Sequence, residues 1–208
     1  MSFSTFFSKQ ARKPSGIFGR FVASRIFDKK NVEMNDFIKE LMTIQQHDHI
    51  LEIGFGTGNL MNEIAELANQ GIVQGIDFSD TMVSVAQKRN RKHIASGRVI
   101  IRQGDFDEIP YDHNKFDKIC STNTIYFWQD PEKTLQKILN LLKTGGKLML
   151  GFHNKTHLEK MSLNWDVFRA YSQDDVKTLL INAGFTGGVD IMSRKGKEAV
   201  SYCAVAAK

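Results

Sequence analysis

An acid followed by three alternating glycines is the part of this sequence with the clearest chemical meaning. Residues 52–58 have the pattern acid-x-Gly-x-Gly-x-Gly, and they follow the apolar run His49–Ile53. Glycine has no Cβ and tolerates positive φ, so Gly54, Gly56 and Gly58 permit a sharp turn from a strand into a helix, with a ligand held against the main chain. The pattern therefore predicts a ligand site built on bare backbone.

The spacing of the glycines narrows the class of ligand. A dinucleotide fingerprint, G-x-G-x-x-G, would need glycine at the position that Asn59 occupies. Nineteen residues after Gly58, the strand-like segment 72–77 ends in Asp77. An acid at that place in an α/β nucleotide site binds ribose hydroxyls. Two strand ends are thus predicted to bind one nucleoside.

Further motifs follow in order over residues 45–152. They are Gln103–Phe106, then Glu108–Tyr111, and the strand-like Phe116–Thr122 followed by Asn123–Trp128. With these motifs the chain resembles the class I S-adenosylmethionine-dependent methyltransferases, in particular the small-molecule branch that includes the ubiquinone and menaquinone C-methyltransferases. The resemblance implies S-adenosyl-L-methionine as the cofactor.

The resemblance also implies which residues bind this cofactor: Glu52, Gly54, Phe55, Gly56, Thr57, Gly58, Asp77, Phe78, Met82, Asp105, Phe106 and Thr122. The backbone of residues 54–58 would face the methionine end, Asp77 the ribose, and Asp105 and Phe106 the adenine. Other interpretations stay open. Asp77 is also suited to cap a helix, Asp105 to stabilise a turn, and the two threonines to bind local backbone.

Methyl transfer from a sulfonium is an in-line displacement, so alignment of the reactants supplies much of the acceleration. A base is needed only if the acceptor must lose a proton. Tyr126 and His153 are the two candidate catalytic residues. Phe127 and Trp128 extend Tyr126 into an aromatic cluster that would wall the acceptor pocket, with core packing as the alternative. A structural hydrogen bond is the alternative for His153.

Some acceptor classes are excluded by residue type. Residues 123–126 lack both prolines of the Asp/Asn-Pro-Pro-aromatic motif that holds planar amines, and Cys120 follows isoleucine instead of the proline found in cytosine C5 enzymes. The segment 153–171 is long enough only for a modest lid. We therefore expect a small, partly apolar acceptor and no nucleic acid. The alternatives are a nicotinamide-dependent oxidoreductase and a non-catalytic S-adenosylmethionine-binding module at a membrane surface.

The basic charge is concentrated at the N-terminus. Residues 1–30 contain seven lysines and arginines and one acid, Asp28, so this segment carries +6. The rest of the chain carries −1, which gives the net charge of +5. Apolar residues 17, 18, 21, 22, 26 and 27 form one helical stripe. Residues 1–32 are predicted to be a basic amphipathic segment that roofs the pocket, contacts an anionic membrane surface weakly, or serves as a transit peptide. Residues 33–208 are predicted to be the methyltransferase domain.

The rest of the chain alternates strand and helix patterns. Strands are predicted at residues 49–53, 72–77, 98–102, 116–122 and 147–152, with a hairpin near 189–192 and 199–206. Helices are predicted over 33–44, after the glycine turn, after Ser79 or Asp80, from Pro131 to Gly145-Gly146, and after a capping box at Ser172. The fold class is α/β, a doubly wound, seven-stranded, mostly parallel Rossmann-like sheet with a C-terminal antiparallel hairpin.

Composition is consistent with one domain plus the N-terminal segment, since 208 residues with 41% hydrophobic content can form one substantial core. Cys120 and Cys203 lie in apolar runs, which favours reduced, buried thiols and a cytoplasmic location. No spacing typical of metal ligands and no apolar run long enough to cross a bilayer is present.

Overall fold

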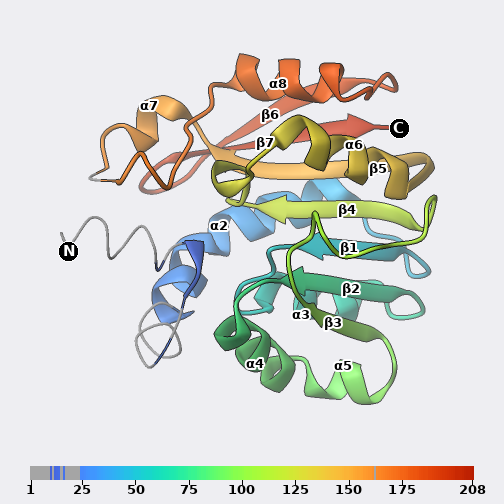
Figure 1. Ribbon diagram of the computed structural model, residues 1–208. Helices are drawn as coiled ribbons and strands as arrows, with labels where there is room; N and C mark the ends of the chain where they lie inside the picture. The colour runs from blue at the N-terminus through green and yellow to red at the C-terminus, as the bar shows by residue number, and fades with distance from the viewer. Residues whose placement is uncertain (1–9, 11, 15, 17–23, 162) are drawn as a thin grey trace.

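One mixed sheet forms the centre of the computed structural model, which describes residues 10, 12–14, 16, 24–161 and 163–208 (Figure 1). Seven strands of these residues lie in the order β3-β2-β1-β4-β5-β7-β6. They are β1 (His49–Ile53), β2 (Ile72–Asp77), β3 (Val99–Gln103), β4 (Phe116–Thr122), β5 (Leu142–His153), β6 (Val189–Lys195) and β7 (Val200–Ala207). Strands β1 to β5 pair in parallel, and β7 is antiparallel to both β5 and β6.

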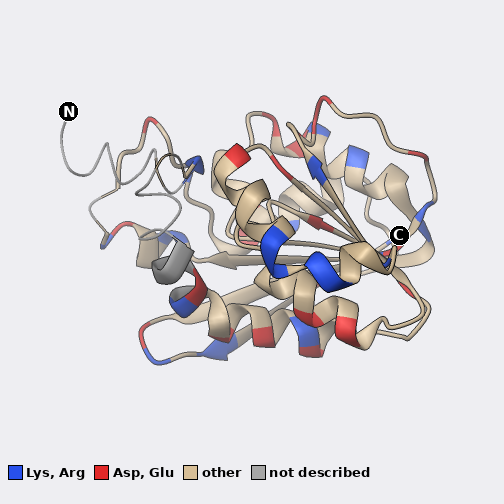
Figure 2. Ribbon diagram, turned by 90° about the horizontal axis from the view of Figure 1, so that it is seen from below, with Lys and Arg blue, Asp and Glu red and all other residues tan. Residues whose placement is uncertain are grey.

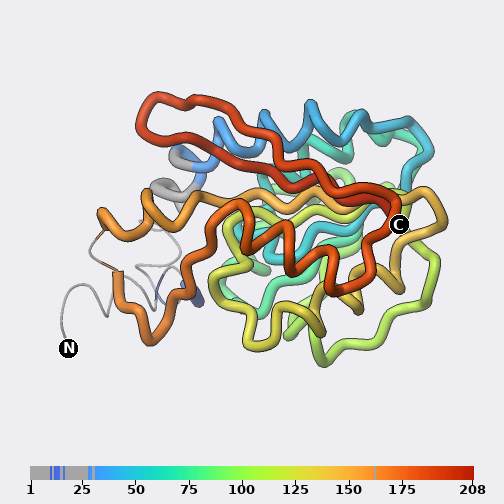
Figure 3. The backbone as a smooth tube through the Cα atoms, turned by 90° about the horizontal axis from the view of Figure 1, so that it is seen from above, coloured from blue at the N-terminus to red at the C-terminus, as the bar shows by residue number. Residues whose placement is uncertain are grey.

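Helices cover both faces of this sheet (Figures 1 and 3). They are α2 (Ser24–Met42), α3 (Asn59–Leu67), α4 (Asp80–Arg89), α5 (Arg91–Ala95), α6 (Pro131–Leu141), α7 (Lys155–Leu158) and α8 (Gln173–Asn182). Apolar residues of α6 and α8 belong to one core cluster, and those of α2, α3 and α4 belong to a second. Successive strand residues enter opposite clusters, as Ile50 and Leu51 do, because side chains alternate across a strand.

The predicted fold class is confirmed, including the C-terminal hairpin. The strand order reverses between β1 and β4. In such sheets ligands bind beyond the carboxyl ends of the strands, where the order reverses. The predicted helix starts are also found. Ser79 caps α4, Asp130 caps α6 ahead of Pro131, and Ser172 forms a capping box with Asp175.

Two boundaries differ from the sequence-based expectation. Helix α6 ends at Leu141, before the glycine pair, because Leu142 is already extended and pairs with Phe116 of β4. Helix α2 begins at Ser24 and runs without a break through residues 32 and 33, where the predicted domain boundary lies. The helical stripe predicted over residues 17–27 lies outside the described side chains.

The two thiols, Cys120 and Cys203, are buried and unpaired with each other. Among the described residues, no helix combines the length and the apolar character that a membrane crossing requires.

Candidate cofactor and acceptor site

The three glycines after β1 have different surroundings. Their φ angles are 72°, 52° and 70° for Gly54, Gly56 and Gly58. A Cβ on Gly54 would collide with the Thr124 side chain, and one on Gly58 would lie 2.7 Å from the Cβ of Ala86, whereas one on Gly56 would meet no atom within 4 Å. Gly54 and Gly58 therefore permit close packing within the protein, and Gly56 leaves open backbone for a ligand.

The carboxylate of Asp77, at the end of β2, holds the glycine turn. Its Oδ2 accepts a hydrogen bond from the Gly56 N–H at 2.9 Å, and its Oδ1 accepts one from the Ser79 N–H at 2.9 Å. Burial raises the pKa of Asp77 to about 6, although the two N–H groups act in the opposite direction. A carboxylate has about four acceptor positions, so Asp77 keeps acceptor capacity for ligand hydroxyls.

Glu52, the second buried acid, lies one residue before the end of β1. The Met61 N–H, in the first turn of α3, bonds to its carboxylate. Its other oxygen, Oε2, has no hydrogen-bond partner within the described residues. Burial, and after it the nearby Asp77, raises the pKa of Glu52 to about 8. A buried polar atom without a partner costs about 1–3 kcal/mol, so Oε2 is suited to a polar group that a ligand brings.

Thr57 is turned away from the open backbone. Its hydroxyl donates to Asp28 Oδ1 on α2 and accepts from Arg89 Nη1 on α4 at 2.6 Å. The Thr57 hydroxyl therefore uses its proton and one of its lone pairs in bonds within the protein. The sequence offered either a cofactor contact or a local bond for this side chain, and the structure shows bonds to two distant elements.

Strand β4 ends beside the glycine turn, since Ser121 is in register with Ile53 of β1. The Thr122 Oγ1 is buried and has no partner within the described part of the chain. Asn123 follows with φ of 57°, which is uncommon for a residue other than glycine. Its side-chain amide contacts Asn31 of α2 at 3.2 Å. Such backbone outliers cluster at functional sites.

Tyr126 has a hydroxyl that is fully engaged. It accepts a hydrogen bond from the His153 N–H and donates to the Asn123 side chain at 3.2 Å. Burial raises the pKa of Tyr126 well above its ordinary value. These features favour a structural role over the role of a base at neutral pH.

His153, at the end of β5, is half-buried. Its Nδ1 lies 3.3 Å from the Val200 carbonyl oxygen, which only accepts, so the neutral ring carries its proton at Nδ1 and its lone pair at Nε2. Burial lowers the pKa of His153, which favours this neutral form. The His157 ring lies 5.2 Å away between ring centroids.

An apolar wall lies beside these residues. The Phe168 ring is 4.7 Å from the Phe127 ring and 6.1 Å from the Tyr126 ring between centroids. The Arg169 N–H donates to the Tyr126 carbonyl at 3.0 Å and fixes the segment 163–171 there. Met161, Leu163 and Val167 pack on the same core. The predicted lid segment therefore packs apolar and aromatic groups onto the residues that follow β4, where Tyr126 and Phe168 are buried in the core.

The predicted adenine side lies after β3. Asp105 is exposed and accepts from the Asp107 N–H at 3.0 Å, which is a turn contact. Phe106 is 7% exposed, with the Lys137 ammonium 4.7 Å from its ring centroid. Lys137 also donates to the Ile109 carbonyl at 2.8 Å. This lysine holds the turn that carries both predicted residues.

The turn after β2 is in contact with the N-terminal segment. Lys13 lies 5.7 Å from the centroid of the half-buried Phe78 ring, and the Ser79 hydroxyl donates to the Pro14 carbonyl at 2.6 Å. Met82 is buried in the first turn of α4, where its N–H bonds to the Ser79 hydroxyl at 3.3 Å. Lys13 and Pro14 thus contact residues next to Asp77.

Phe55 is placed differently from the other predicted residues. Its ring is buried in the core cluster of α2 and α3 and lies close to Gly75 of β2. The ring therefore packs behind the turn, and only the Phe55 backbone borders the open side.

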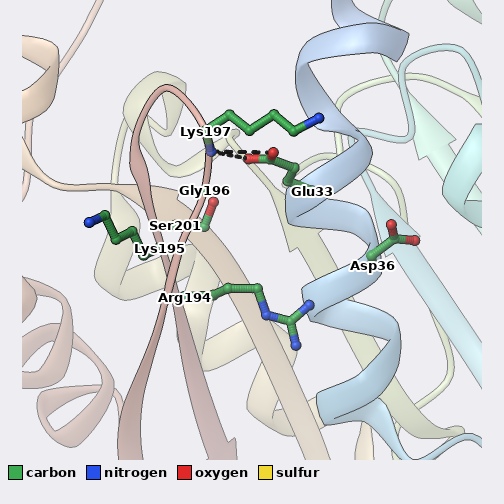
Figure 4. A pocket seen from close by; sticks show the side chains of 7 residues that line it. All are labelled: Glu33, Asp36, Arg194, Lys195, Gly196, Lys197 and Ser201. Atoms are coloured by element: carbon green, nitrogen blue, oxygen red, sulfur yellow. Dashed lines mark hydrogen bonds between the residues drawn. The ribbon is translucent and has the colours of Figure 1, made fainter.

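A cavity of about 420 Å³ lies between α2 and the β6–β7 turn (Figure 4). Glu33 and Asp36 line it from α2, and Arg194 and Lys197 line it from the hairpin. The Glu33 carboxylate accepts from the Lys197 N–H at 3.1 Å. No residue of the glycine turn borders this cavity, and its charges join the hairpin to α2.

Comparison with known proteins gives the family. A family model described as a methyltransferase domain matches residues 44–184. YdaC of Bacillus subtilis (strain 168), an uncharacterized methyltransferase, is 26% identical over 187 residues, which cover 90% of this chain and 98% of YdaC. The ubiquinone/menaquinone biosynthesis C-methyltransferase UbiE of Proteus mirabilis (strain HI4320) is 24% identical over 144 residues, 69% of this chain and 57% of UbiE.

A solved structure agrees on the fold. A SAM-dependent methyltransferase from Aquifex aeolicus superposes with a TM-score of 0.70 at 18% identity, over 99% of both chains. With Asn59 in place of a dinucleotide glycine, these matches set aside the oxidoreductase alternative. Because the methyltransferase model covers more than half of its residues, the chain belongs to this family, and it is a class I S-adenosylmethionine-dependent methyltransferase that resembles UbiE.

Proposed function

We propose that the chain methylates a small, partly apolar molecule that binds between the ends of β4 and β5 and the segment 163–171. The observation that supports this best is the apolar wall formed by Phe127, Phe168 and their neighbours beside the strand ends. Ligand pockets are lined mainly by apolar and aromatic groups with a few polar ones. Asn123 and His153 are the polar groups at this wall.

The cofactor site is proposed at the glycine turn. Gly56 offers open backbone, Asp77 offers acceptors for ribose hydroxyls, and Glu52 Oε2 and Thr122 Oγ1 are buried polar atoms that lack partners within the described residues. When bound, S-adenosylmethionine supplies an electrophilic methyl group on a cationic sulfur. Two buried carboxyl groups suit such a cation, because a nearby positive charge favours their ionised forms.

The chain's own contribution to the reaction is mainly positioning, which supplies about 7–11 kcal/mol in well-oriented reactions. If the acceptor loses a proton, His153 is the better candidate to receive it, because its neutral ring carries a lone pair at Nε2. The hydroxyl of Tyr126 holds Asn123 and the His153 backbone in place.

The N-terminal segment is proposed to be a lid. Pro14 contacts Ser79, Asp28 contacts Thr57, and Asn31 contacts Asn123. Contacts of these three described residues with the ends of β2, β1 and β4 support this proposal. They favour the lid over the alternatives of a membrane-surface helix and a transit peptide.

Labelled S-adenosylmethionine and a metabolite extract test the proposal. The extract is divided into organic-soluble, aqueous and macromolecular fractions, and each is incubated with the chain. We expect label in a small molecule of the organic-soluble fraction. A His153→Asn variant is expected to retain cofactor affinity and to transfer more slowly if proton removal is required.

Label found only in nucleic acid or protein would contradict the proposed acceptor. Tight binding of S-adenosylmethionine without transfer to any fraction would favour the non-catalytic module.

A further inference from the structure

Three elements meet at the hydroxyl of Thr57, which is 6% exposed. Arg89, the last residue of α4, donates through Nη1 to the Thr57 hydroxyl at 2.6 Å and to the Thr57 carbonyl at 3.3 Å. It also pairs with Asp28 of α2 through two bonds, Nη1 to Oδ1 at 3.2 Å and Nη2 to Oδ2 at 2.6 Å. The Thr57 hydroxyl itself donates to Asp28. The three side chains form a closed ring of hydrogen bonds.

Asp28 and Arg89 each differ from their neighbours in the chain, Asp28 in its charge and Arg89 in its burial. Asp28 is the sole acid among residues 1–32. Arg89 belongs to a basic run that also contains Lys88, Arg91 and Lys92, and lysines and arginines follow one another along the end of α4 and α5 (Figure 2). Those three neighbours are exposed, whereas the side chains of Arg89 and Asp28 are 30% and 31% exposed. This pair is turned toward the glycine turn.

The end of α4 holds the turn at a second point. The Asn90 Nδ2 donates to the Gly58 carbonyl at 3.0 Å. Helix α2 is in turn fixed from its other side by the hairpin, because Arg194 of β6 pairs with Glu40 and lies 4.6 Å from the Phe37 ring centroid. Asp28 is therefore presented from an anchored helix to the turn that surrounds the open Gly56.

We propose that Asp28 and Arg89 are positioning residues, which clamp Thr57 so that the glycine turn keeps its cofactor-binding shape and the first turns of α2 remain closed over it. The proposal rests on the proposed cofactor site. Neither side chain needs to touch the cofactor. Loss of either one frees the Thr57 hydroxyl, the turn and α2 together, and the cofactor then dissociates faster.

Asp28→Asn and Arg89→Gln test the clamp, with Asp36→Asn on α2 and Lys88→Gln on α4 as matched controls. The first measurement uses the protein without cofactor and follows hydrogen exchange in peptides covering residues 54–60. The second follows the dissociation rate of S-adenosylmethionine by stopped flow. Because hydrogen bonds to charged groups contribute about 1.5–3 kcal/mol, each clamp variant is expected to exchange and to release cofactor at least roughly tenfold faster than its control.

The double variant Asp28→Asn/Arg89→Gln is expected to be little worse than either single variant, because the three side chains act as one unit. Thr57→Val in the Asp28→Asn background should likewise add little. In steady-state kinetics with varied S-adenosylmethionine, the clamp variants should show a large rise in KM for the cofactor and only a small fall in kcat. A purely structural role would lower Tm and leave the dissociation rate of the folded protein unchanged.

Clamp variants that match their controls in both exchange and dissociation would overturn the proposal. Faster exchange of the turn in the clamp variants, together with a wild-type chain that binds no S-adenosylmethionine, would support the clamp and contradict the proposed cofactor site. The two proposals thus fail on different measurements.

Discussion

Gly54 and Gly56 of the glycine turn should respond differently to the same substitution. Gly56→Ala places a methyl group where no atom lies within 4 Å, and Gly54→Ala drives it into Thr124. Both substitutions also force alanine into a positive φ, which costs about 1–2 kcal/mol. We expect Gly56→Ala to lose most S-adenosylmethionine affinity with a modest loss of stability, and Gly54→Ala to lose mainly stability.

Calorimetric titration and guanidinium unfolding of both variants separate these effects. Equal affinity of Gly56→Ala and wild type would show that the open backbone is not where the ligand approaches.

Glu52 makes the stability of the cofactor-free protein depend on pH. Its pKa is raised from 4.5 to about 8, so the folded chain binds more protons than the unfolded chain between these values. The free energy of unfolding should therefore fall as the pH rises through this window. Asp77, raised from 3.8 to about 6, adds to the fall at the lower end.

Glu52→Gln removes the largest of these contributions because the amide does not ionise. Relative to wild type, the variant should gain stability steadily between about pH 5 and about pH 9 in guanidinium unfolding. A difference between the two proteins that stays constant over this range would contradict the raised pKa.

Among single residues, the sequence predicted where Glu52, Asp77 and the three glycines lie, because their spacing places them at strand ends. It did not predict the partners of Thr57. Asp28 and Arg89 lie 29 and 32 residues from Thr57 in the chain, and no local pattern relates the three. The ring of Phe55 was also unpredictable, since either face of the turn accommodates an aromatic residue there.

Among the elements, the segment 163–171 has the clearest expected effect on acceptor binding. Phe168→Leu keeps the apolar volume and removes the ring contact with Phe127. Aromatic pairs contribute about 0.5–1.5 kcal/mol, here to holding the segment 163–171 against the residues after β4. A looser segment should raise KM for the acceptor by up to roughly tenfold, with cofactor affinity unchanged. Phe185→Leu, in the same core but after α8, is the control. Steady-state kinetics with the identified acceptor would show whether the two variants differ.

Most elements were predictable from periodicity and capping residues, since β4 and the capping box of α8 match their expected positions. The end of α6 was not, because pairing of Leu142 with Phe116 outweighs the helix-stopping glycines that follow. The short helices α5 and α7 carry too few residues for a periodic signal. Continuity of α2 through residue 32 likewise depends on its tertiary contacts.

For the whole molecule, two apolar clusters on opposite faces of one sheet should unfold together. Met34 of α2 belongs to one cluster and Trp128 to the other. Met34→Ala should cost about 2–5 kcal/mol. Because the sheet joins both clusters, the Trp128 fluorescence transition, followed in a Trp165→Phe background, and the far-ultraviolet circular dichroism transition should shift together. Separate midpoints would mean that the two faces unfold independently.

The order β5-β7-β6 has a consequence for synthesis on the ribosome. Strand β6 is made before β7 and pairs with β7 alone. Until β7 has left the exit tunnel, β6 has no strand to pair with. Strand β5 has an open edge on the side where β7 will pair. The glycine turn and the first five strands are available for folding during this interval. A nascent chain stalled after β6 should therefore already bind cofactor weakly while remaining a target for chaperones that recognise unpaired strands.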